Sequence, residues 1–578
     1  MTDVLNVSAS AARGALLGVA VGDALGWPQE LRGGLVGGQR ARDHIESRPR
    51  FIPWTRQGGH YTSKYPDQVD AGEYSDDTQL MLAVARSCLI GRDWYDHLTH
   101  VELAAWPLYQ RGGGGAVLSA AGSWANDGIG PWVDDGSARR SKLVKRYFGA
   151  GANGVAMRIA PHVICGRSER EIVERVVRDG LATHGHPRAL VGALVYAAAL
   201  RKAFGSSSAL EFGELLDAGL EGLVPVDRML AYAPPGWLSD NAIQGYAVDW
   251  AKTNQEVTEL LETASASMRR GALSNAETTL GELGCVNPAI CGAGTVTAVG
   301  AIYVASRFAA RPVSGLLTAA FLRKGDTDTL ASMSAALLGA IHGTQWFEGL
   351  SEDVQDAEYI NRIASQLTSG STVSRIAPPE LGIKRTSQAW RRSILDARPG
   401  QHGTFVDGRE YTVESKQQLD ATHQRVRIRL ADGQTALHDA RSTVATAKRS
   451  TPGTTNAPTL EEAAHDDTLP ASSAPYEASV VAVTAFTPDL ARAVSFYAKL
   501  LGRDIVVRGN EARVTTWFHL RESASASHMD ASGITVQVTD LRAVARRLNI
   551  SPAEDGAHVQ TLRDPDGRYV RIEVGSSM

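Results

Sequence analysis

Residues 14–26, GALLGVAVGDALG, decide the fold class because almost all of them are small or apolar. Two later stretches, 78–89 (TQLMLAVARSCL) and 328–343 (DTLASMSAALLGAIHG), repeat apolar residues every three or four positions. That spacing places the apolar side chains on one face of a helix. No run of strand-like alternation separates these stretches. The sequence therefore predicts an all-α domain over residues 1–372.

The composition favours the same fold and excludes several classes of protein. The 578-residue chain is 43% hydrophobic and only 6% aromatic, and its 57 glycines favour closely packed helices over a body of sheets. A net charge of −4 does not indicate a protein whose surface as a whole binds nucleic acid or membranes, which are themselves anionic. The length indicates roughly three to four domains.

Thiol content and apolar runs indicate the compartment. The chain has four cysteines and no C-x-x-C pair, which is typical of a reducing environment and excludes a zinc knuckle. The start of the sequence lacks the basic and apolar regions of a signal peptide. The most apolar run, ALVGALVYAAAL at 189–200, is too short to cross a bilayer. We therefore predict a cytoplasmic protein with no membrane partner.

The chain changes character after about residue 372. Residues 375–447 contain β-rich runs broken by Asp-Gly pairs, which predict hairpins in a small β-rich module. Residues 448–475 are polar and rich in proline and serine, as flexible linkers are. In residues 476–578 the pattern of a strand, a helix and further strands occurs twice, which predicts an α+β module of paired βαβββ units.

Two acidic turns, far apart in the chain, each precede an apolar helix: Ser75-Asp76-Asp77-Thr78, and the group Asp326, Asp328 and Thr329. One polar residue is enough to cap a helix, which stabilises the helix by about 1 kcal/mol. Capping therefore explains part of each turn but not the second carboxylate. Four carboxylates brought together and buried are strongly disfavoured unless cations neutralise them.

Ligands that are all oxygen atoms predict a site for hard divalent cations. Carboxylates and hydroxyls suit Mg²⁺ or Mn²⁺ rather than zinc. Two such ions roughly 3.5–4 Å apart are a recurrent arrangement in hydrolytic enzymes. The sequence therefore predicts that the two acidic turns fold into one pocket that holds a pair of these ions.

Several other residues are ambiguous on local sequence alone. Glu30 lies in a turn that contains glycine and proline, where an exposed glutamate is common. Gly149, Gly151 and Gly154 form a G-x-G-x-x-G pattern, but a basic segment precedes it in place of a buried strand. Such a loop is either a plain turn or a place where backbone N–H groups approach a phosphate. The histidines of THGHP (183–187) are not needed as metal ligands.

Together these motifs resemble the ADP-ribosylglycohydrolases, a family that includes the dinitrogenase reductase-activating glycohydrolase. The motifs are GALLGVAVGDALGWPQE, YSDDTQL, GANGVAMRIAP, THGHP and GDTDT, which occur in family order over residues 12–345. The resemblance implies an orthogonal all-α fold, a binuclear Mg²⁺ or Mn²⁺ centre, and a hydrolase that removes ADP-ribose from an acceptor.

The resemblance also implies roles for individual residues. The implied metal ligands are Ser75, Asp76, Asp77, Asp326, Asp328 and Thr329. Glu30 and Asp77 are the implied catalytic residues. The implied substrate-binding residues are Ala152, Asn153 and Gly154 on a diphosphate loop, and His184 in the ADP-ribose cleft. Lys324 departs from the family, in which a glycine is frequent at this position.

The implied reaction passes through a cation-like anomeric carbon when the N- or O-glycosidic bond breaks. The metals would hold ribose hydroxyls and a water, and a carboxylate would move the proton. The residues leave open whether that carboxylate is Glu30, Asp76, Asp77 or Asp328. Arginine is the favoured acceptor because bacterial-type members often act there. An acceptor serine, a nucleic-acid base or a small molecule stays open.

Residues 477–575 resemble the vicinal oxygen chelate family, which includes glyoxalase and bleomycin-resistance proteins, through FTPDLARAVSFYAKLLG and DPDGRYVRIEVG. Metal enzymes of that family place His, Gln or Glu on four strands. Gln537 and Glu573 occupy plausible positions and His519 is a further candidate, but VVAVTAF offers no ligand. We therefore predict a binding or dimerisation module. Two alternatives for the whole chain are a non-catalytic ADP-ribose-binding protein and a C-terminal lyase or dioxygenase.

Overall fold

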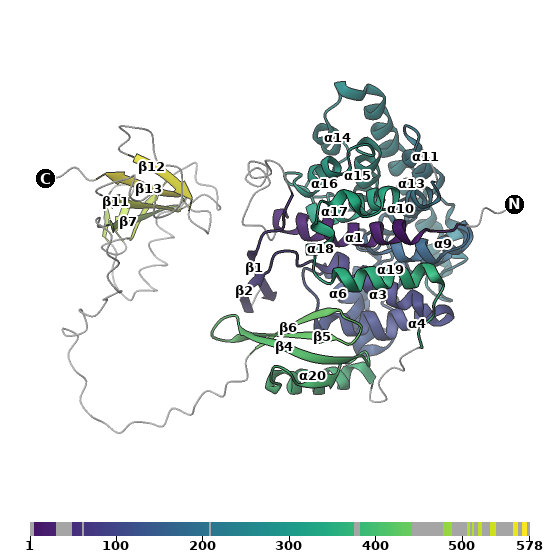
Figure 1. Ribbon diagram of the computed structural model, residues 1–578, viewed down its shortest axis with the longest axis horizontal. Helices are drawn as coiled ribbons and strands as arrows, with labels where there is room; N and C mark the ends of the chain where they lie inside the picture. The colour runs from purple at the N-terminus through teal and green to yellow at the C-terminus, as the bar shows by residue number, and fades with distance from the viewer. Residues whose placement is uncertain are drawn as a thin grey trace. The chain divides into compact units, whose positions relative to one another are not determined.

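The computed structural model describes residues 5–30, 49–60, 63–206, 210–374 and 382–441, and beyond residue 477 it describes strands alone. The chain forms two compact units that divide between residues 444 and 445. The first unit is largely helical and ends in a small sheet (Figure 1). None of the described helices is both long and apolar enough to span a membrane.

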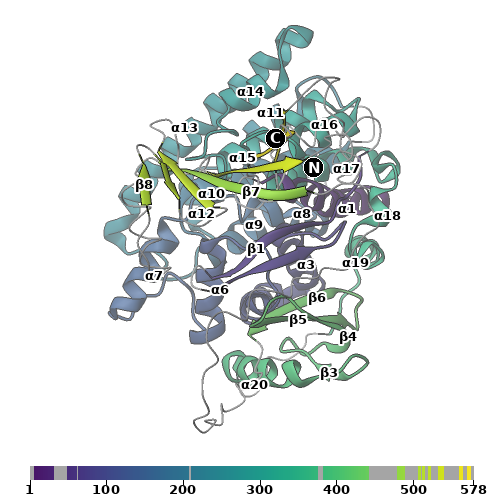
Figure 2. The same ribbon diagram turned by 90° about the vertical axis from the view of Figure 1, so that its left-hand side faces the viewer.

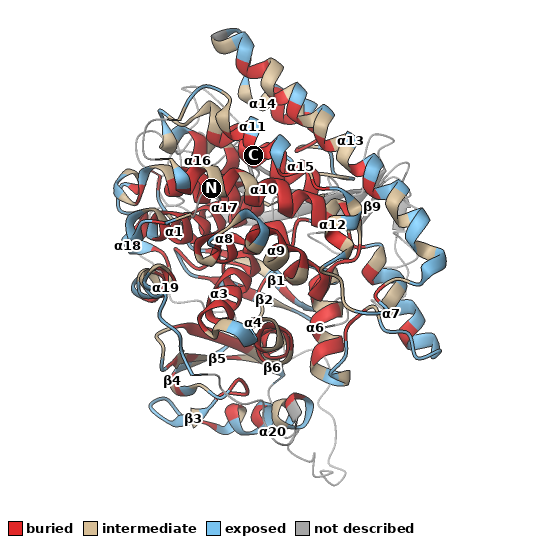
Figure 3. Cartoon of the chain, turned by 90° about the vertical axis from the view of Figure 1, so that its right-hand side faces the viewer, coloured by how far each residue is buried: buried red, intermediate tan, exposed pale blue. Residues whose placement is uncertain are grey.

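The centre of the first unit is the contact between helix α1 (Ala9–Gly26) and helix α17 (Thr327–His342). Gly14, Gly18, Gly22 and Gly26 recur every fourth residue and therefore lie on one face of α1. A Cβ atom added to any of them would lie 2.1–2.3 Å from a backbone oxygen of α17. The two backbones thus touch directly, and both helices are buried along almost their whole length (Figure 3).

Other helices enclose this pair. Those with the most buried residues are α3 (Asp76–Leu89), α10 (Pro187–Gly205) and α15 (Gly294–Arg307). Shorter or more peripheral ones are α6 (Gly115–Asp127), α7 (Ala138–Phe148), α8 (Ala160–Cys165), α9 (Glu169–Thr183), α11 (Glu214–Glu221), α13 (Asp240–Arg270), α14 (Ala276–Glu282), α16 (Pro312–Ala320) and α19 (Ala357–Ser369). The expectation of a largely helical domain is confirmed.

A β-hairpin within this unit corrects the all-α prediction. Strands β1 (Trp54–His60) and β2 (Ser63–Val69) pair in antiparallel register. Their polar sequence lacks the apolar alternation that marks a strand, so tertiary contacts hold the hairpin in place. Trp54 packs edge-on against Trp27 with ring centroids 5.3 Å apart, and the Arg56 guanidinium lies 4.9 Å from the Trp27 ring centroid.

A four-stranded antiparallel sheet ends the first unit, as the Asp-Gly pairs predicted. Its order is β3 (His402–Thr404), β4 (Glu410–Gln418), β5 (His423–Leu430) and β6 (Thr435–Arg441). The region predicted to be β-rich also contains helix α20 (Gly382–Asp396), which the sequence reading missed. Figure 2 shows the sheet next to the hairpin and the helices.

Arginines on one face of β5 attach the sheet to the helical body. Arg425 binds Asp67, Arg427 lies 3.5 Å from Glu73, and Arg429 lies 3.0 Å from Asp356. All three acids are buried or nearly so in the helical body and its hairpin. Alternate residues of a strand share a face, so the sequence RVRIRL directs its charges to the helices and its apolar residues to the other side of the sheet.

The second unit contains a seven-stranded sheet in the order β12-β13-β11-β7-β10-β9-β8. The strands are β7 (Ala478–Thr487), β8 (Val506–Arg508), β9 (Glu511–Arg513), β10 (Phe518–Glu522), β11 (Ser532–Val538), β12 (Val559–Arg563) and β13 (Tyr569–Val574). The two expected helices and the linker 448–475 lie outside the described residues. Gln537 of β11 pairs with Glu573 of β13, and His519 lies on β10. The likeness to vicinal oxygen chelate proteins stays a prediction.

We expect Gly22→Ala to lower the free energy of unfolding of the first unit by about 1–3 kcal/mol or more, as overpacking does. The added methyl group would lie 2.3 Å from the Ala331 carbonyl oxygen and would force α1 and α17 apart. Urea denaturation followed by tryptophan fluorescence measures this.

The matched control is Gly245→Ala in the exposed N-terminal part of α13, where an added Cβ meets nothing within 4 Å. It should stabilise the protein by about 0.5–1 kcal/mol through helix propensity. Equal changes in the two variants would contradict the close contact of α1 with α17.

Candidate metal centre and substrate cleft

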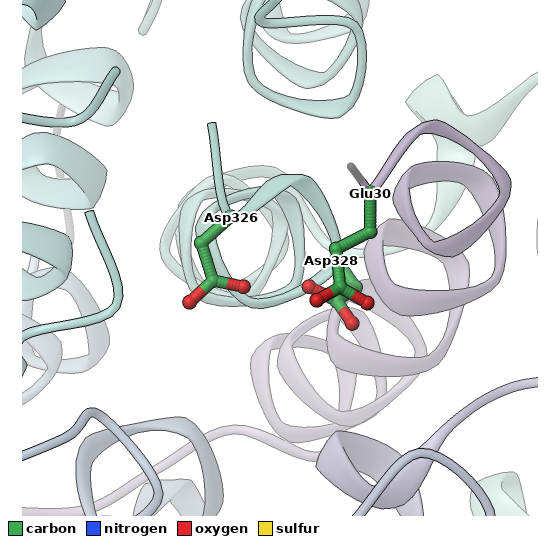
Figure 4. A group of neighbouring side chains, drawn as sticks. All are labelled: Glu30, Asp326 and Asp328. Atoms are coloured by element: carbon green, nitrogen blue, oxygen red, sulfur yellow. The ribbon is translucent and has the colours of Figure 1, made fainter. Parts of the chain in front are cut away.

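Three carboxylates at one end of the central helix pair form a compact group. Glu30 follows the short 3-10 helix η1 (Trp27–Gln29) at the end of α1, Asp326 is the N-cap of α17, and Asp328 lies in its first turn. One oxygen atom of each lies within 4.8 Å of the others (Figure 4). The group exists because the α1–α17 contact brings the end of one helix to the start of the other.

The second acidic turn, at the start of α3, reaches the same place. The hydroxyl of Ser332 donates to Oδ1 of Asp77 at 2.8 Å, and that of Thr329 donates to Oδ2 at 3.3 Å. Asp76 faces the glycine loop after Arg111, since a Cβ on Gly112 would lie 3.0 Å from its Oδ1. The structure thus brings together two acidic turns that lie about 250 residues apart.

Asp23 holds the acidic turn at the start of α3 in place, a role that sequence reasoning missed. Its carboxylate accepts hydrogen bonds from the backbone N–H groups of Ser75 and Thr78, each at 3.0 Å, and from the Thr78 hydroxyl at 2.6 Å. The side chain is completely buried. Its place in the GDALG motif beside Glu30 is the signal that could have found it.

The cluster is electrostatically costly without a cation. Burial, followed by the charges of Asp23 and Glu30, raises the pKa of Asp76 to about 8. Burial and neighbouring carboxylates also hold the pKa values of Asp77 and Asp328 well above their usual range. A bound divalent cation would favour the charged form of every one of these groups.

The donor set fits the ions predicted from the sequence. Glu30, Asp326 and Asp328 supply oxygen ligands alone, with Asp76, Asp77 and the Thr329 hydroxyl nearby, which suits Mg²⁺ or Mn²⁺. Glu30, expected to be catalytic, is thereby also a candidate ligand. Ser75, expected to be a ligand, is buried away from the cavity lining, and its hydroxyl accepts from the Asp77 N–H at 3.4 Å as a helix cap.

The predicted diphosphate loop is joined directly to the acidic cluster. The Asn153 side-chain amide donates to Oδ2 of Asp326 at 2.9 Å and to the Thr297 hydroxyl at 3.1 Å. The loop pairs with a second segment, because Asn153 N–H donates to the Gly292 carbonyl and Gly294 N–H donates to the Gly151 carbonyl, both at 3.0 Å. A Cβ atom on Gly292, also missed, would lie 2.9 Å from Oδ2 of Asp326 and would displace that carboxylate.

His184 lies beside this loop as a neutral hydrogen-bond donor. Burial, and then the Arg158 charge, lowers its pKa to about 3. The Thr183 hydroxyl accepts a hydrogen bond from Arg158 and lies against Nδ1 of His184, both at 2.8 Å. When this hydroxyl donates to Nδ1, the imidazole proton lies on Nε2. That nitrogen is buried without a partner among the described residues, although the side chain lines the cavity. A ligand oxygen in the cavity would satisfy it.

The acidic cluster, the two glycine loops and His184 line one cavity of about 1280 Å³, which is large enough for a dinucleotide-sized ligand. Ala152, Asn153, Gly154 and Thr329 are part of the lining. Lys324 is exposed outside it, and its φ of +68° explains why glycine suits that position. The hairpin and the sheet also contribute lining residues, which the sequence did not predict.

A family model described as ADP-ribosylglycohydrolase matches residues 6–376. The chain belongs to the ADP-ribosylglycohydrolase family. The expected resemblance is thereby confirmed for this part of the chain. This is a family of hydrolases. The acidic group of this chain lies within the matched residues, where α1 meets α17.

Two similar proteins accompany that match. The "Uncharacterized protein YegU" of Escherichia coli (strain K12) is 24% identical over 334 residues, which cover 57% of this chain and 87% of YegU. A solved structure described as "ADP-ribosylglycohydrolase-related protein complex" is 22% identical with a TM-score of 0.38, covering 63% of this chain and 99% of that one.

We expect Asp23→Asn to weaken Mn²⁺ binding by about 10–100-fold, as the loss of an outer-shell partner does. The amide cannot accept all the hydrogen bonds that now fix the turn before α3. Titration followed by the electron paramagnetic resonance of free Mn²⁺ measures the affinity. Asp249→Asn, on the exposed face of α13, should keep wild-type affinity. A wild-type affinity for Asp23→Asn would refute this role.

We also expect Mg²⁺ affinity to rise with pH between 6 and 8. In the metal-free protein the Asp76 carboxyl is mostly protonated below its pKa of about 8. Because the metal must displace this proton, its affinity falls about tenfold for each unit by which the pH is lowered. Calorimetric titration at several pH values measures this slope. Asp76→Asn removes one of the carboxyl groups whose pKa is raised and should reduce the slope, and a flat wild-type slope would contradict the raised pKa.

Proposed function

We propose that this protein is a binuclear Mg²⁺- or Mn²⁺-dependent hydrolase that cleaves the glycosidic bond between ADP-ribose and an acceptor, thereby reversing ADP-ribosylation. The observation that carries the proposal is the compact group of Glu30, Asp326 and Asp328 in the cavity wall, with Asp76 and Asp77 beside it. Family membership supports the same reaction class. A protein that only held the helical fold would gain nothing from burying so many like charges.

Different groups in the cavity would bind the substrate and carry out the reaction. Bound cations would lower the pKa of a water and fix the ribose hydroxyls. Because the Asn153 N–H already donates to the Gly292 carbonyl, the backbone of Ala152 and Gly154 beside it would meet the diphosphate, and Nε2 of His184 would meet a further ligand oxygen. This binding, remote from the bond that breaks, positions the anomeric carbon at the acidic cluster.

Glu30 is the carboxylate best placed to move the proton. Both oxygens of Asp77 accept hydrogen bonds from Thr329 and Ser332, which confines Asp77 to the helix interface. Glu30 is only half-buried and opens onto the cavity. Its carboxylate therefore takes a proton from the attacking water, and the leaving acceptor receives one as the bond breaks.

We propose ADP-ribosyl-arginine as the first substrate to test, with serine-linked and base-linked ADP-ribose as the other acceptors. The protein would act in the cytoplasm on an ADP-ribosylated protein, nucleic acid or small molecule. The C-terminal unit would serve binding or dimerisation.

We expect wild-type protein with Mg²⁺ to release ADP-ribose from one of these three substrates. Asp77→Asn and Asp328→Asn should each reduce the rate by about 10²–10⁴-fold, because each removes a negative charge that the cations require. Chromatographic detection of free ADP-ribose measures the rate, and Asp249→Asn serves as the control with a wild-type rate. Metal-bound protein that binds ADP-ribose but cleaves none of the substrates would favour the non-catalytic alternative.

A further inference from the structure

A buried thiol, an imidazole and a carboxylate form a hydrogen-bonded chain outside the substrate cavity. Sγ of Cys88, near the end of α3, lies 3.3 Å from Nδ1 of His162 in α8. Nε2 of His162 lies 2.9 Å from Oδ2 of Asp179 in α9. All three side chains are buried, and none of them is among the residues that line the cavity. The proposed reaction therefore makes no use of this nucleophile and its base.

The carboxylate fixes where the protons of this chain lie. Although burial opposes it, the Arg158 charge lowers the pKa of Asp179, so this carboxylate is ionised and only accepts hydrogen bonds. Nε2 of His162 is therefore a donor. Burial lowers the pKa of His162, which keeps the imidazole neutral and leaves Nδ1 as an acceptor. The Cys88 thiol thus donates to Nδ1, and His162 is positioned to act as the base for that thiol.

A second thiol lies beside the first. Cys165 is the last residue of α8, three positions after His162, and residues three apart share one face of a helix. Helix α8 packs against α3, and the two thiols interact directly. The interaction with Cys88 lowers the pKa of Cys165, burial opposes it, and the Arg175 charge lowers it further. Cys165 is also partly exposed, so the more acidic thiol is the one that solvent reaches.

The other two cysteines have different surroundings. The Cys285 thiol points at the carbonyl oxygen of Val296, 3.8 Å away. Burial, and then the nearby Cys291, raises the pKa of Cys285 to about 12. A carbonyl oxygen is no base for a thiol at neutral pH, whereas the imidazole beside Cys88 is one. Oxidation is therefore expected at the pair between α3 and α8.

We propose that Cys88 and Cys165 are a redox pair, which hydrogen peroxide converts from two thiols to an intramolecular disulfide. The Cys165 thiolate attacks the peroxide, the O–O bond breaks, and Cys165 becomes a sulfenic acid while hydroxide leaves. The Cys88 sulfur then attacks the Cys165 sulfur, and its proton passes to Nδ1 of His162. The S–O bond breaks, and the departing hydroxide takes up that proton as water. The thiols are thus oxidised, and the peroxide is reduced to water.

The hydrogen-bonded chain continues from Asp179 to the ligand-binding residues. Arg158 donates to Oδ1 of Asp179 at 2.6 Å and to the Gly154 carbonyl oxygen of the predicted diphosphate loop at 2.8 Å. It also donates to the Thr183 hydroxyl, which lies against Nδ1 of His184, both at 2.8 Å. A shift of the Asp179 carboxylate would therefore be felt both at this loop and at the histidine of the cavity.

The disulfide would cause such a shift, because it removes the proton that Nδ1 of His162 accepts. A buried polar atom that loses its partner is costly, so His162 and Asp179 would rearrange. We expect the oxidised protein to bind ADP-ribose about five- to tenfold less tightly than the reduced protein. This consequence rests on the proposed function, whereas the disulfide itself does not.

The test treats the full-length protein, freed of reductant, with hydrogen peroxide. We expect two of the four thiols to be lost and to return with dithiothreitol. Peptide mass mapping without reduction should show Cys88 joined to Cys165. Cys88→Ser and Cys165→Ser should each prevent this crosslink, and Cys88→Ser should leave Cys165 as a sulfenic acid that dimedone traps. Cys291→Ser is the matched control, because it removes a thiol of the other pair, and it should form the crosslink as the wild type does.

A second measurement follows the ligand site. Calorimetric titration of ADP-ribose into the Mg²⁺-loaded protein gives its affinity before and after oxidation. Cys165→Ser, treated with peroxide in the same way, should keep the affinity of the reduced protein.

Each remaining outcome has a defined meaning. A protein that keeps its thiols in peroxide, or that joins Cys285 to Cys291 instead, would overturn the inference and show that Cys88 only satisfies His162. A Cys88–Cys165 disulfide with unchanged ADP-ribose affinity would overturn the coupling to the ligand site. If neither the reduced nor the oxidised protein binds ADP-ribose, the proposed function fails while the disulfide stands.

Discussion

The direct contact between the backbones of α1 and α17 is the constraint on which the rest of the structure depends. Four glycines spaced by four residues remove every side chain from one face of α1, so that two polar backbones pass at van der Waals distance. The helices thereby become a rigid pair whose ends meet. Glu30 after the end of α1 and Asp326 and Asp328 at the start of α17 are thereby held close together in spite of the repulsion between their charges.

Hydrogen bonds from the residues around this cluster fix the positions of its carboxylates. Asp23 fixes the turn before α3, the hydroxyls of α17 hold Asp77, and Asn153 joins the glycine loop to Asp326. Each contact links a residue predicted from the sequence to one on another helix. The site is therefore organised before any ligand arrives, which is the condition for electrostatic stabilisation of a charged transition state.

The sequence predicted those parts of the protein whose signals are local. Helical periodicity indicated the helical body, the acidic turns indicated the aspartates of the cluster, and the Asp-Gly pairs indicated the sheet, whereas Glu30 was expected only through the family resemblance. The β1–β2 hairpin was missed because its strands are polar and are stabilised by Trp27 and by Arg425, which are distant in the chain. Asp23, Gly292 and the docking of the sheet were missed for the same reason. Their roles depend on which neighbours the fold supplies, and no short window of sequence contains those neighbours.

The docking of the sheet through Arg425 sets an order in which the protein can be completed on the ribosome. The acidic cluster needs the chain only as far as α17, whereas the arginines that hold the hairpin emerge about a hundred residues later. Until then the nascent chain has its carboxylates assembled but one side of its cavity unfinished. A truncation in this interval would thus leave the acidic cluster without the element that completes the wall of its cavity.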